Sequence, residues 1–285
     1  MNSIMKSFDS AKTLQQAVSF VKSKGCYHRV YSLYTNIDRI REMLTGKTHR
    51  LWLTRLDSGK FDDGLEGERY GAEAERSLTY IKCFMSGSQE SAAMWGLYCP
   101  PTYKAIRLSI PQCAMLALCR SKLYKIRKGN NSNVPCDARS VMGADLVYAA
   151  VEGDVGQSGR SHTLFWNGQY TKKIFNLQEA KCWKNITGLV KDIEWKFENE
   201  FRLVVKVKKE SGTHIAIELP DEFIKSLKFT LSPWANNDER SFVKGRLVEW
   251  LRCAGRIVVS EDSDLFKASA LSHGLKQWAQ NRGLQ

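Results

Sequence analysis

The stretch Ile193–Val207 (IEWKFENEFRLVVKV) constrains the fold most, because charged residues interrupt what is otherwise a buried β-strand. Side chains of a strand alternate between its two faces. One face then carries Phe197, Asn199, Phe201, Leu203 and Val205, and the other carries Glu198, Glu200, Arg202 and Val204. The apolar run at 203–205 predicts sheet interior on both faces. The carboxylates must therefore be paired or must line a cleft, and the pattern leaves both open.

The composition indicates a globular protein without a membrane span. The chain has 285 residues, of which 43% are hydrophobic, and this is enough to bury a sizeable core. No apolar run of about 18 residues occurs, and the polar N-terminus with Asp9 does not fit a signal peptide. The eight cysteines form no CxxC pair, so we expect reduced thiols, no metal site and a cytoplasmic location.

The chain is strongly basic, with 43 Lys and Arg against 30 Asp and Glu and a formal net charge of +13. Such a surface attracts polyanions such as nucleic acid, although an inert basic surface is the alternative. Basic clusters occur at 120–128, 172–173 and 206–209. The candidate nucleic-acid-binding residues are Arg120, Lys122, Lys125, Arg127 and Lys128.

The order of predicted elements favours an α+β fold. The patterns predict strands at 27–35, 50–56, 79–85, 103–110, 147–151, 193–207, 214–219, 224–231 and 257–260. They predict helices at 1–25, 37–44, 91–98, 112–118, 164–184, 239–254 and 272–280, with loops at 57–71 and 153–161. Without a regular βαβ alternation, we expect a mixed, largely antiparallel central sheet flanked by helices.

The expected domain organisation has three parts. Residues 1–26 form an N-terminal helix, and residues 27–231 form the α+β domain. Residues 232–285 form a C-terminal helical extension packed on the same domain. No GxSxG, HExxH, GxxxxGK[ST] or strand-linked GxGxxG motif occurs, so the common catalytic signatures are absent from the sequence.

Three segments, at 51–63, 82–107 and 182–204, carry a resemblance to a known family. Their most specific pieces are Cys83-Phe84, Met94–Tyr98 (MWGLY) and Glu198–Arg202 (ENEFR). On these motifs, residues 27–231 resemble the DUF2971 family of poorly characterised bacterial proteins. The chain departs from the family pattern where Asp62-Asp63 stand in place of Asn-Asp. It departs again where Tyr103–Ala105 replace His-Lys-Gly.

The order of elements is also similar, more distantly, to the ADP-ribosyltransferase fold. That resemblance implies NAD as cofactor, with Glu200 as the leading catalytic residue and Glu198 second. Breaking the nicotinamide–ribose bond passes through an oxocarbenium-like state that a carboxylate stabilises. The implied cofactor-binding residues are His28, Arg29 and Arg55 for the pyrophosphate, Tyr31, Tyr34 and Trp52 for nicotinamide, and Trp95 and Tyr98 for the pocket wall. Core packing or simple surface exposure is the alternative for each of these residues.

These resemblances imply a bacterial effector or toxin of a phage-defence type system that modifies a nucleic acid or a protein, with a regulatory protein as a further partner. Two alternatives stay open. One is a non-catalytic nucleic-acid-binding or sensing module. The other is a metal-dependent nuclease that uses Asp57, Asp62 and Asp63 with Glu198 and Glu200.

Overall fold

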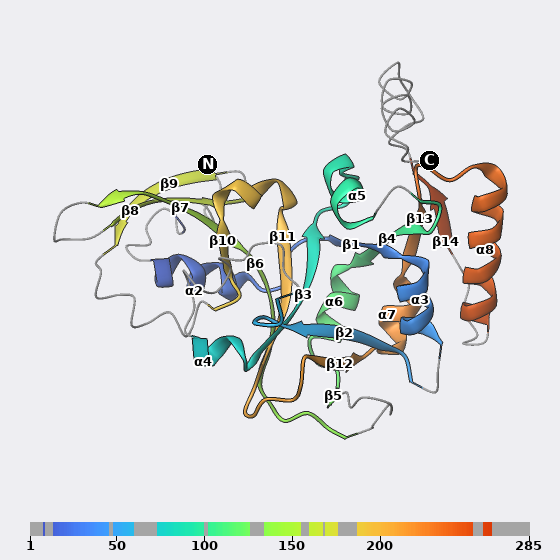
Figure 1. Ribbon diagram of the computed structural model, residues 1–285, viewed down its shortest axis with the longest axis horizontal. Helices are drawn as coiled ribbons and strands as arrows, with labels where there is room; N and C mark the ends of the chain where they lie inside the picture. The colour runs from blue at the N-terminus through green and yellow to red at the C-terminus, as the bar shows by residue number, and fades with distance from the viewer. Residues whose placement is uncertain are drawn as a thin grey trace, which may run out of the picture. The chain divides into compact units, whose positions relative to one another are not determined.

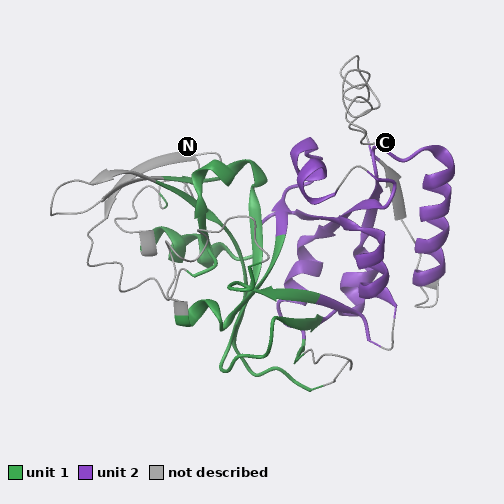
Figure 2. Ribbon diagram, in the orientation of Figure 1, with its two compact units in different colours: residues 1–27, 52–83, 122–217 green, residues 28–51, 84–121, 218–285 purple. Residues whose placement is uncertain are grey.

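The computed structural model describes residues 8, 14–45, 48–59, 73–99, 102–125, 134–154, 160–167, 169–175, 187–252 and 259–263 (Figure 1). The protein has a mixed α/β fold with a large, mainly antiparallel sheet. The chain divides into two compact units (Figure 2). Unit 1 comprises residues 1–27, 52–83 and 122–217, and unit 2 comprises residues 28–51, 84–121 and 218–285. The expected three-part domain division stays a prediction.

Unit 2 is built on neighbouring strands that are hydrogen bonded in the order β14 (Val259–Asp262), β13 (Lys228–Leu231), β4 (Ala105–Pro111), β1 (Val30–Asn36) and the end of β3 (Thr79–Ser86). All of these pairs are antiparallel except β13 with β14. The helices are α3 (Ile37–Leu44), α5 (Ala92–Tyr98), α6 (Gln112–Leu118), α7 (Asp221–Ser226) and α8 (Asn237–Arg252). Helix α6 packs against α7, and α3 packs against α8.

Helix α3 shows how local sequence sets an element boundary. Asn36 is the N-cap, and its side chain accepts a hydrogen bond from the Arg39 backbone N–H at 3.0 Å. The buried residues Ile37, Ile40 and Leu44 recur at helical spacing and turn one face of α3 to the core. The predicted strand at 27–35 and helix at 37–44 are therefore confirmed.

Unit 1 contains the rest of the strands. Strand β11 (Glu200–Val207) pairs along its length with β6 (Ala138–Asp145) and also pairs with β3. Strand β3 is followed in order by β2 (Arg50–Arg55), β12 (His214–Glu218) and β5 (Leu123–Lys125). A second sheet has the order β10 (Val190–Asp192), β7 (Val147–Asp154), β8 (Arg160–Trp166) and β9 (Gln169–Phe175). Helix α2 (Leu14–Lys24), helix α4 (Glu73–Arg76) and the 3-10 helix η3 (Ile193–Glu198) complete the unit.

An aromatic cluster packs in the core of unit 1. Trp166 contacts the rings of Phe8, Phe20 and Tyr27 at centroid distances of 5.2, 5.7 and 6.0 Å. The buried Asp145 carboxylate accepts hydrogen bonds from Tyr27 Oη at 2.7 Å and Trp166 Nε1 at 3.2 Å. The polar ends of both rings are thereby satisfied, so the rings can be buried without the cost of an unpaired donor.

Three predicted elements outside the 193–207 segment were wrong. Where residues of the helix predicted at 164–184 are described, they belong to strands β8 and β9, with Asn167 (φ 47°) after β8, and residues 176–184 lie outside the described residues. The sequence there reads Trp-Asn-Gly-Gln, and Asn-Gly between aromatic and β-branched residues is a hairpin signal that the helical prediction overlooked. The strand predicted at 224–231 begins within helix α7. The loop predicted at 153–161 is strand at both of its described ends, 153–154 in β7 and 160–161 in β8, and residues 155–159 lie outside the described residues. The helix predicted at 272–280 lies outside the described residues.

Across the described ranges, no helix is long and apolar enough to cross a membrane.

Gly143 provides a test of the β6–β11 packing. It lies opposite Leu203 in the sheet, and an added Cβ would come within 2.5 Å of Phe201 Cζ and 2.8 Å of Cys26 Sγ. Because Phe201 is fully buried, its ring has no free space to move into. We expect Gly143→Ala to lower the free energy of unfolding by about 1–3 kcal/mol, measured by urea denaturation.

Gly245→Ala is the matched control, since Gly245 lies in α8 and nothing lies within 4 Å of its added Cβ. Alanine should stabilise the exposed helix by about 0.5–1 kcal/mol. Equal stability of the two variants would contradict the tight packing at Gly143.

Candidate functional site

The backbone at Asn199 separates the two glutamates predicted to share a strand face. Residues 193–198 form η3, in which Asp192 is the N-cap and accepts from the Glu194 N–H at 3.2 Å. Asn199 then adopts a left-handed conformation (φ 43°), which Asn tolerates better than most residues, and β11 starts only at Glu200. The prediction that residues 193–198 belong to the strand was therefore wrong. Of Glu198, Glu200 and Arg202, only Glu200 and Arg202 lie on the strand, where they share one face.

Glu200 and Arg202 form a buried, two-point ion pair. Arg202 Nε donates to Glu200 Oε1 at 2.6 Å, and its NH2 group donates to Oε2 at 3.0 Å. The Arg202 side chain also donates to the Gly188 carbonyl at 3.1 Å. Glu200 is 4% exposed and Arg202 is inaccessible to solvent, so the pair lies inside the sheet. Of the two alternatives that the sequence left open, the structure shows an ion pair.

Lys191 brings Glu198 into the same group. Its Nζ lies 2.7 Å from Glu198 Oε2 and 3.5 Å from Glu200 Oε2, and it also lies 4.4 Å from the centre of the Trp195 ring. We call Lys191, Glu198, Glu200 and Arg202 the buried charge cluster. Two cations balance two carboxylates in it, which is the condition under which buried charges are tolerated.

The neighbours of the cluster perturb its titration. Burial raises the pKa of Glu200, Lys191 lowers it and the nearby Glu198 raises it, and the net result is a pKa of about 7. Burial lowers the pKa of Lys191, but the charges of Glu200 and Glu198 outweigh it, and the net direction is upward. A carboxyl group that titrates near neutrality can take part in proton transfer.

Two uncharged groups complete these surroundings. Tyr148 Oη accepts the Glu200 backbone N–H at 2.6 Å, and Cys83 forms a side-chain hydrogen bond with Glu200. Burial, together with the adjacent Glu200 charge, raises the pKa of both the Tyr148 phenol and the Cys83 thiol. A thiol with a raised pKa is a weak nucleophile, so Cys83 acts here as a hydrogen-bonding neighbour of the carboxylate.

Six of the residues that the resemblance assigned to NAD lie in unit 2, and the structure brings some of them together. Tyr34 and Trp95 are buried in edge-to-face contact at 5.1 Å, and the Tyr34 hydroxyl accepts the Ser91 backbone N–H at 2.9 Å. His28 and Tyr31 form a second edge-to-face pair at 5.8 Å. These aromatic contacts are typical of core packing. The two others, Arg29 and Tyr98, are both exposed.

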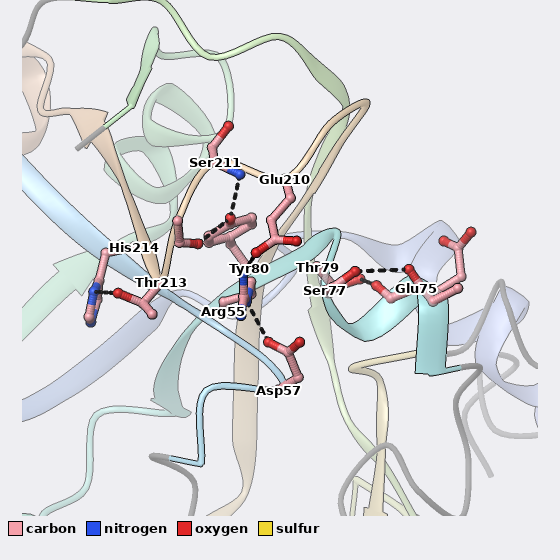
Figure 3. A network of polar contacts seen from close by, with 12 residues as sticks. Arg55, Asp57, Glu75, Ser77, Thr79, Tyr80, Glu210, Ser211, Thr213 and His214 are labelled. Atoms are coloured by element: carbon pink, nitrogen blue, oxygen red, sulfur yellow. Dashed lines mark hydrogen bonds and ion pairs between the residues drawn. The ribbon is translucent and has the colours of Figure 1, made fainter. Parts of the chain in front are cut away.

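The other two assigned residues, Trp52 and Arg55, lie on β2 in unit 1. Arg55 binds two carboxylates, with Nε 2.5 Å from Asp57 Oδ1 and NH1 in contact with Glu210 (Figure 3). Trp52 is 37% exposed and its ring contacts His214 at 5.9 Å. Both side chains therefore have partners other than the glutamates of the buried charge cluster.

The predicted basic residues are partly described. Arg120 and Lys122 are exposed and Lys125 is half-buried, while Arg127 and Lys128 lie outside the described residues. Asp62 and Asp63, invoked for a nuclease, also lie outside them. Within the described part of the chain, no group of three or more His, Cys, Asp and Glu side chains is placed to hold a metal ion.

The structure brings together a second set of charged side chains, around Glu75, that the sequence did not predict. Lys206 Nζ lies 3.7 Å from Glu75 Oε2, and Arg139 NH1 lies 3.9 Å from Glu75 Oε1. Burial lowers the pKa of Lys206, and the charges of Lys22 and Arg139 lower it further, against the raising effect of Glu75. We call Lys22, Arg139 and Lys206 around Glu75 the basic cluster. Only Lys206 belonged to a basic run of the sequence, because the others come from α2 and β6.

No family model, no curated protein and no solved structure matches this chain. The fold class and the geometry described above therefore carry the functional argument.

The raised pKa of Glu200 predicts how stability depends on pH. The folded protein holds this proton more tightly (pKa about 7) than an unfolded chain does (ordinary value 4.5), so stability should rise as pH falls between these values. The free energy of unfolding should change by at most about 1.4 kcal/mol per pH unit. Glu200→Gln should remove this contribution, as measured by urea denaturation between about pH 7.5 and about pH 5.

Glu194→Gln serves as the control, because Glu194 lies on the neighbouring η3 and is exposed. It should keep the wild-type pH dependence. If Glu200→Gln and the wild type showed parallel stability profiles across this range, the carboxyl group would not titrate there.

Proposed function

We propose that the protein binds nucleic acid through the phosphate backbone, using the basic surface of unit 1. The observation that carries this proposal is the basic cluster, in which cations from β6 and β11 lie beside the Glu75 carboxylate and Lys22 of α2 lies near Lys206. Its four side chains, Lys22, Glu75, Arg139 and Lys206, carry a net charge of +2. Like charges placed together cost free energy unless a polyanion neutralises them.

The surroundings of the cluster support the same proposal. Glu75 is held by α4, whose carbonyl at this residue accepts a hydrogen bond from Thr79 Oγ1 at 2.6 Å (Figure 3). Arg139 has a side chain that is 50% exposed, so its guanidinium can reach a phosphate. Lys208 and Lys209 are exposed next to Lys206, and the whole chain carries a formal charge of +13. Phosphate contacts of this kind dominate non-specific nucleic-acid binding.

The proposal predicts salt-dependent binding that weakens when the cluster loses charge. Lys22→Ala/Arg139→Ala should bind labelled DNA more weakly than the wild type does. The slope of log K against log salt should become shallower by about 1.4–1.8, because two counterion-releasing contacts are lost. Fluorescence anisotropy between about 50 and about 200 mM salt measures both effects.

The matched control is Lys225→Ala/Lys228→Ala, which removes two exposed lysines from unit 2. It should leave the slope close to that of the wild type. Binding that is flat with salt, or equal losses in the two double variants, would argue against this cluster as the binding surface.

A second candidate function is ADP-ribosyl transfer with NAD as the cofactor. It is favoured by Glu200, a carboxyl group whose pKa is raised to about 7 and which lies beside a second carboxylate, Glu198. Catalysis would require the Glu200 carboxylate to exchange its contacts with Arg202 for contacts with the ribose. The basic surface would then present a nucleic-acid target to the enzyme.

Labelled NAD, incubated with the protein in the presence of DNA, RNA or cell lysate, tests this second function. Transfer of label by the wild type, lost in Glu200→Gln and kept in Glu222→Gln on the exposed surface of α7, is the expected result. Absence of label transfer under every condition would contradict the enzymatic function and would not affect the proposal of nucleic-acid binding. The effector role in phage defence, the protein target, the regulatory partner and metal-dependent nuclease activity remain proposals from the sequence alone.

A further inference from the structure

The outward face of strands β2, β12 and β5 carries a row of aromatic side chains. Alternate residues of these strands point inward and are buried, namely Leu53, Leu123, Ile215 and Ile217. The residues between them point the other way: Trp52 is 37% exposed, and Tyr124 and His214 are half-buried. Strand geometry therefore places Trp52, Tyr124 and His214 on one face of the sheet.

The strand register aligns these side chains. The Arg55 N–H donates to the Thr213 carbonyl at 2.9 Å, which places β12 antiparallel beside β2 with Thr54 opposite His214 and Trp52 opposite Ala216. On the other side of β12, Ala216 lies opposite Tyr124. An indole and a phenol thus flank one small residue across three strands, and residues opposite each other share a face.

A polar network lies at the ends of β2 and β12, next to Thr213 and His214. Arg55 joins Asp57 and Glu210, and Tyr80 Oη donates to the Gly212 carbonyl at 2.6 Å and accepts the Ser211 N–H at 3.1 Å (Figure 3). A hydrogen bond of 2.9 Å joins Thr213 Oγ1 and His214 Nδ1. The His214 ring is therefore oriented before any ligand arrives, and it contacts the Trp52 ring at 5.9 Å.

We propose that Trp52, Tyr124 and His214, which we call the aromatic platform, stack on the unpaired bases of single-stranded nucleic acid. The proposal rests on the nucleic-acid binding proposed above and specifies the form of nucleic acid that the protein selects. Exposed aromatic rings on a sheet offer flat surfaces to bases, and stacking is tolerant of base identity. Duplex bases are already stacked and cannot reach such a surface.

Charge beside the platform fits the same ligand. Lys122 is exposed and directly precedes β5, two residues before Tyr124. It can therefore contact a phosphate that lies next to a stacked base. Single-strand binding sites combine cations that follow the backbone with aromatic rings that receive the bases.

The test compares two labelled oligonucleotides of about 12 nucleotides, one of thymidines and one of abasic sites with the same phosphates. The wild type should bind the thymidine strand at least about tenfold more tightly, since stacking acts only on bases. Trp52→Ala should reduce this preference to about one, and Trp52→Phe should keep most of it. Phe242→Ala, which removes another exposed ring on α8, should leave the preference unchanged.

The outcomes separate this inference from the proposed function. Lys22→Ala/Arg139→Ala should weaken both oligonucleotides equally and preserve the preference. Salt-dependent but equal binding of both strands by the wild type would overturn the platform and leave backbone binding standing. No binding of either strand would overturn both. Binding of a uridine oligoribonucleotide, measured in parallel, shows whether the protein prefers RNA or DNA. Trp52→Ala should leave the binding of duplex nucleic acid unaffected.

Discussion

The structure of unit 1 depends on the neutralisation of charge inside its sheet. Strand β11 is buried on both faces and pairs with both β3 and β6, yet it carries Glu200 and Arg202. An isolated ionised group in such a place would be prohibitively costly. The two-point contact between these side chains, together with Lys191 and Glu198, keeps the balance neutral. Removing a single member would leave an uncompensated charge in the sheet.

Unit 1 therefore contains two charged groups with opposite properties. The buried charge cluster is balanced and inaccessible, whereas the basic cluster has an excess of positive charge and a partly exposed Arg139. Glu75 is the single carboxylate among the three cations of the basic cluster, so two of their positive charges are not balanced within it. The buried charge cluster is suited to stabilising the fold, and the basic cluster is suited to binding a polyanion. The aromatic platform adds a base-directed surface to the same unit.

Element types were predictable wherever local pattern and local chemistry agree. Asn36 capping α3 is one example, since its amphipathic stripe and its cap are both encoded within a few residues. The hairpin at Asn167 was not predicted, because short runs of aromatic and apolar residues are compatible with both a helix and a strand. The Asn-Gly turn is the signal that distinguishes the two. The prediction of a continuous strand through Asn199 was also wrong. The left-handed backbone of Asn199 ends η3, so Glu198 does not take part in the alternation of β11.

The sequence by itself determined the mixed α/β class of the fold, the excess of positive charge and the requirement that the Glu200 carboxylate is either paired or lines a cleft. These properties follow from composition, period and the cost of buried charge, none of which requires knowledge of distant contacts. Only the tertiary structure decided that Lys191 joins Glu200, that Lys22 and Arg139 meet Lys206, and that Trp52 lies in line with Tyr124. The partners in each group come from separate strands and helices, and only chain folding brings them together.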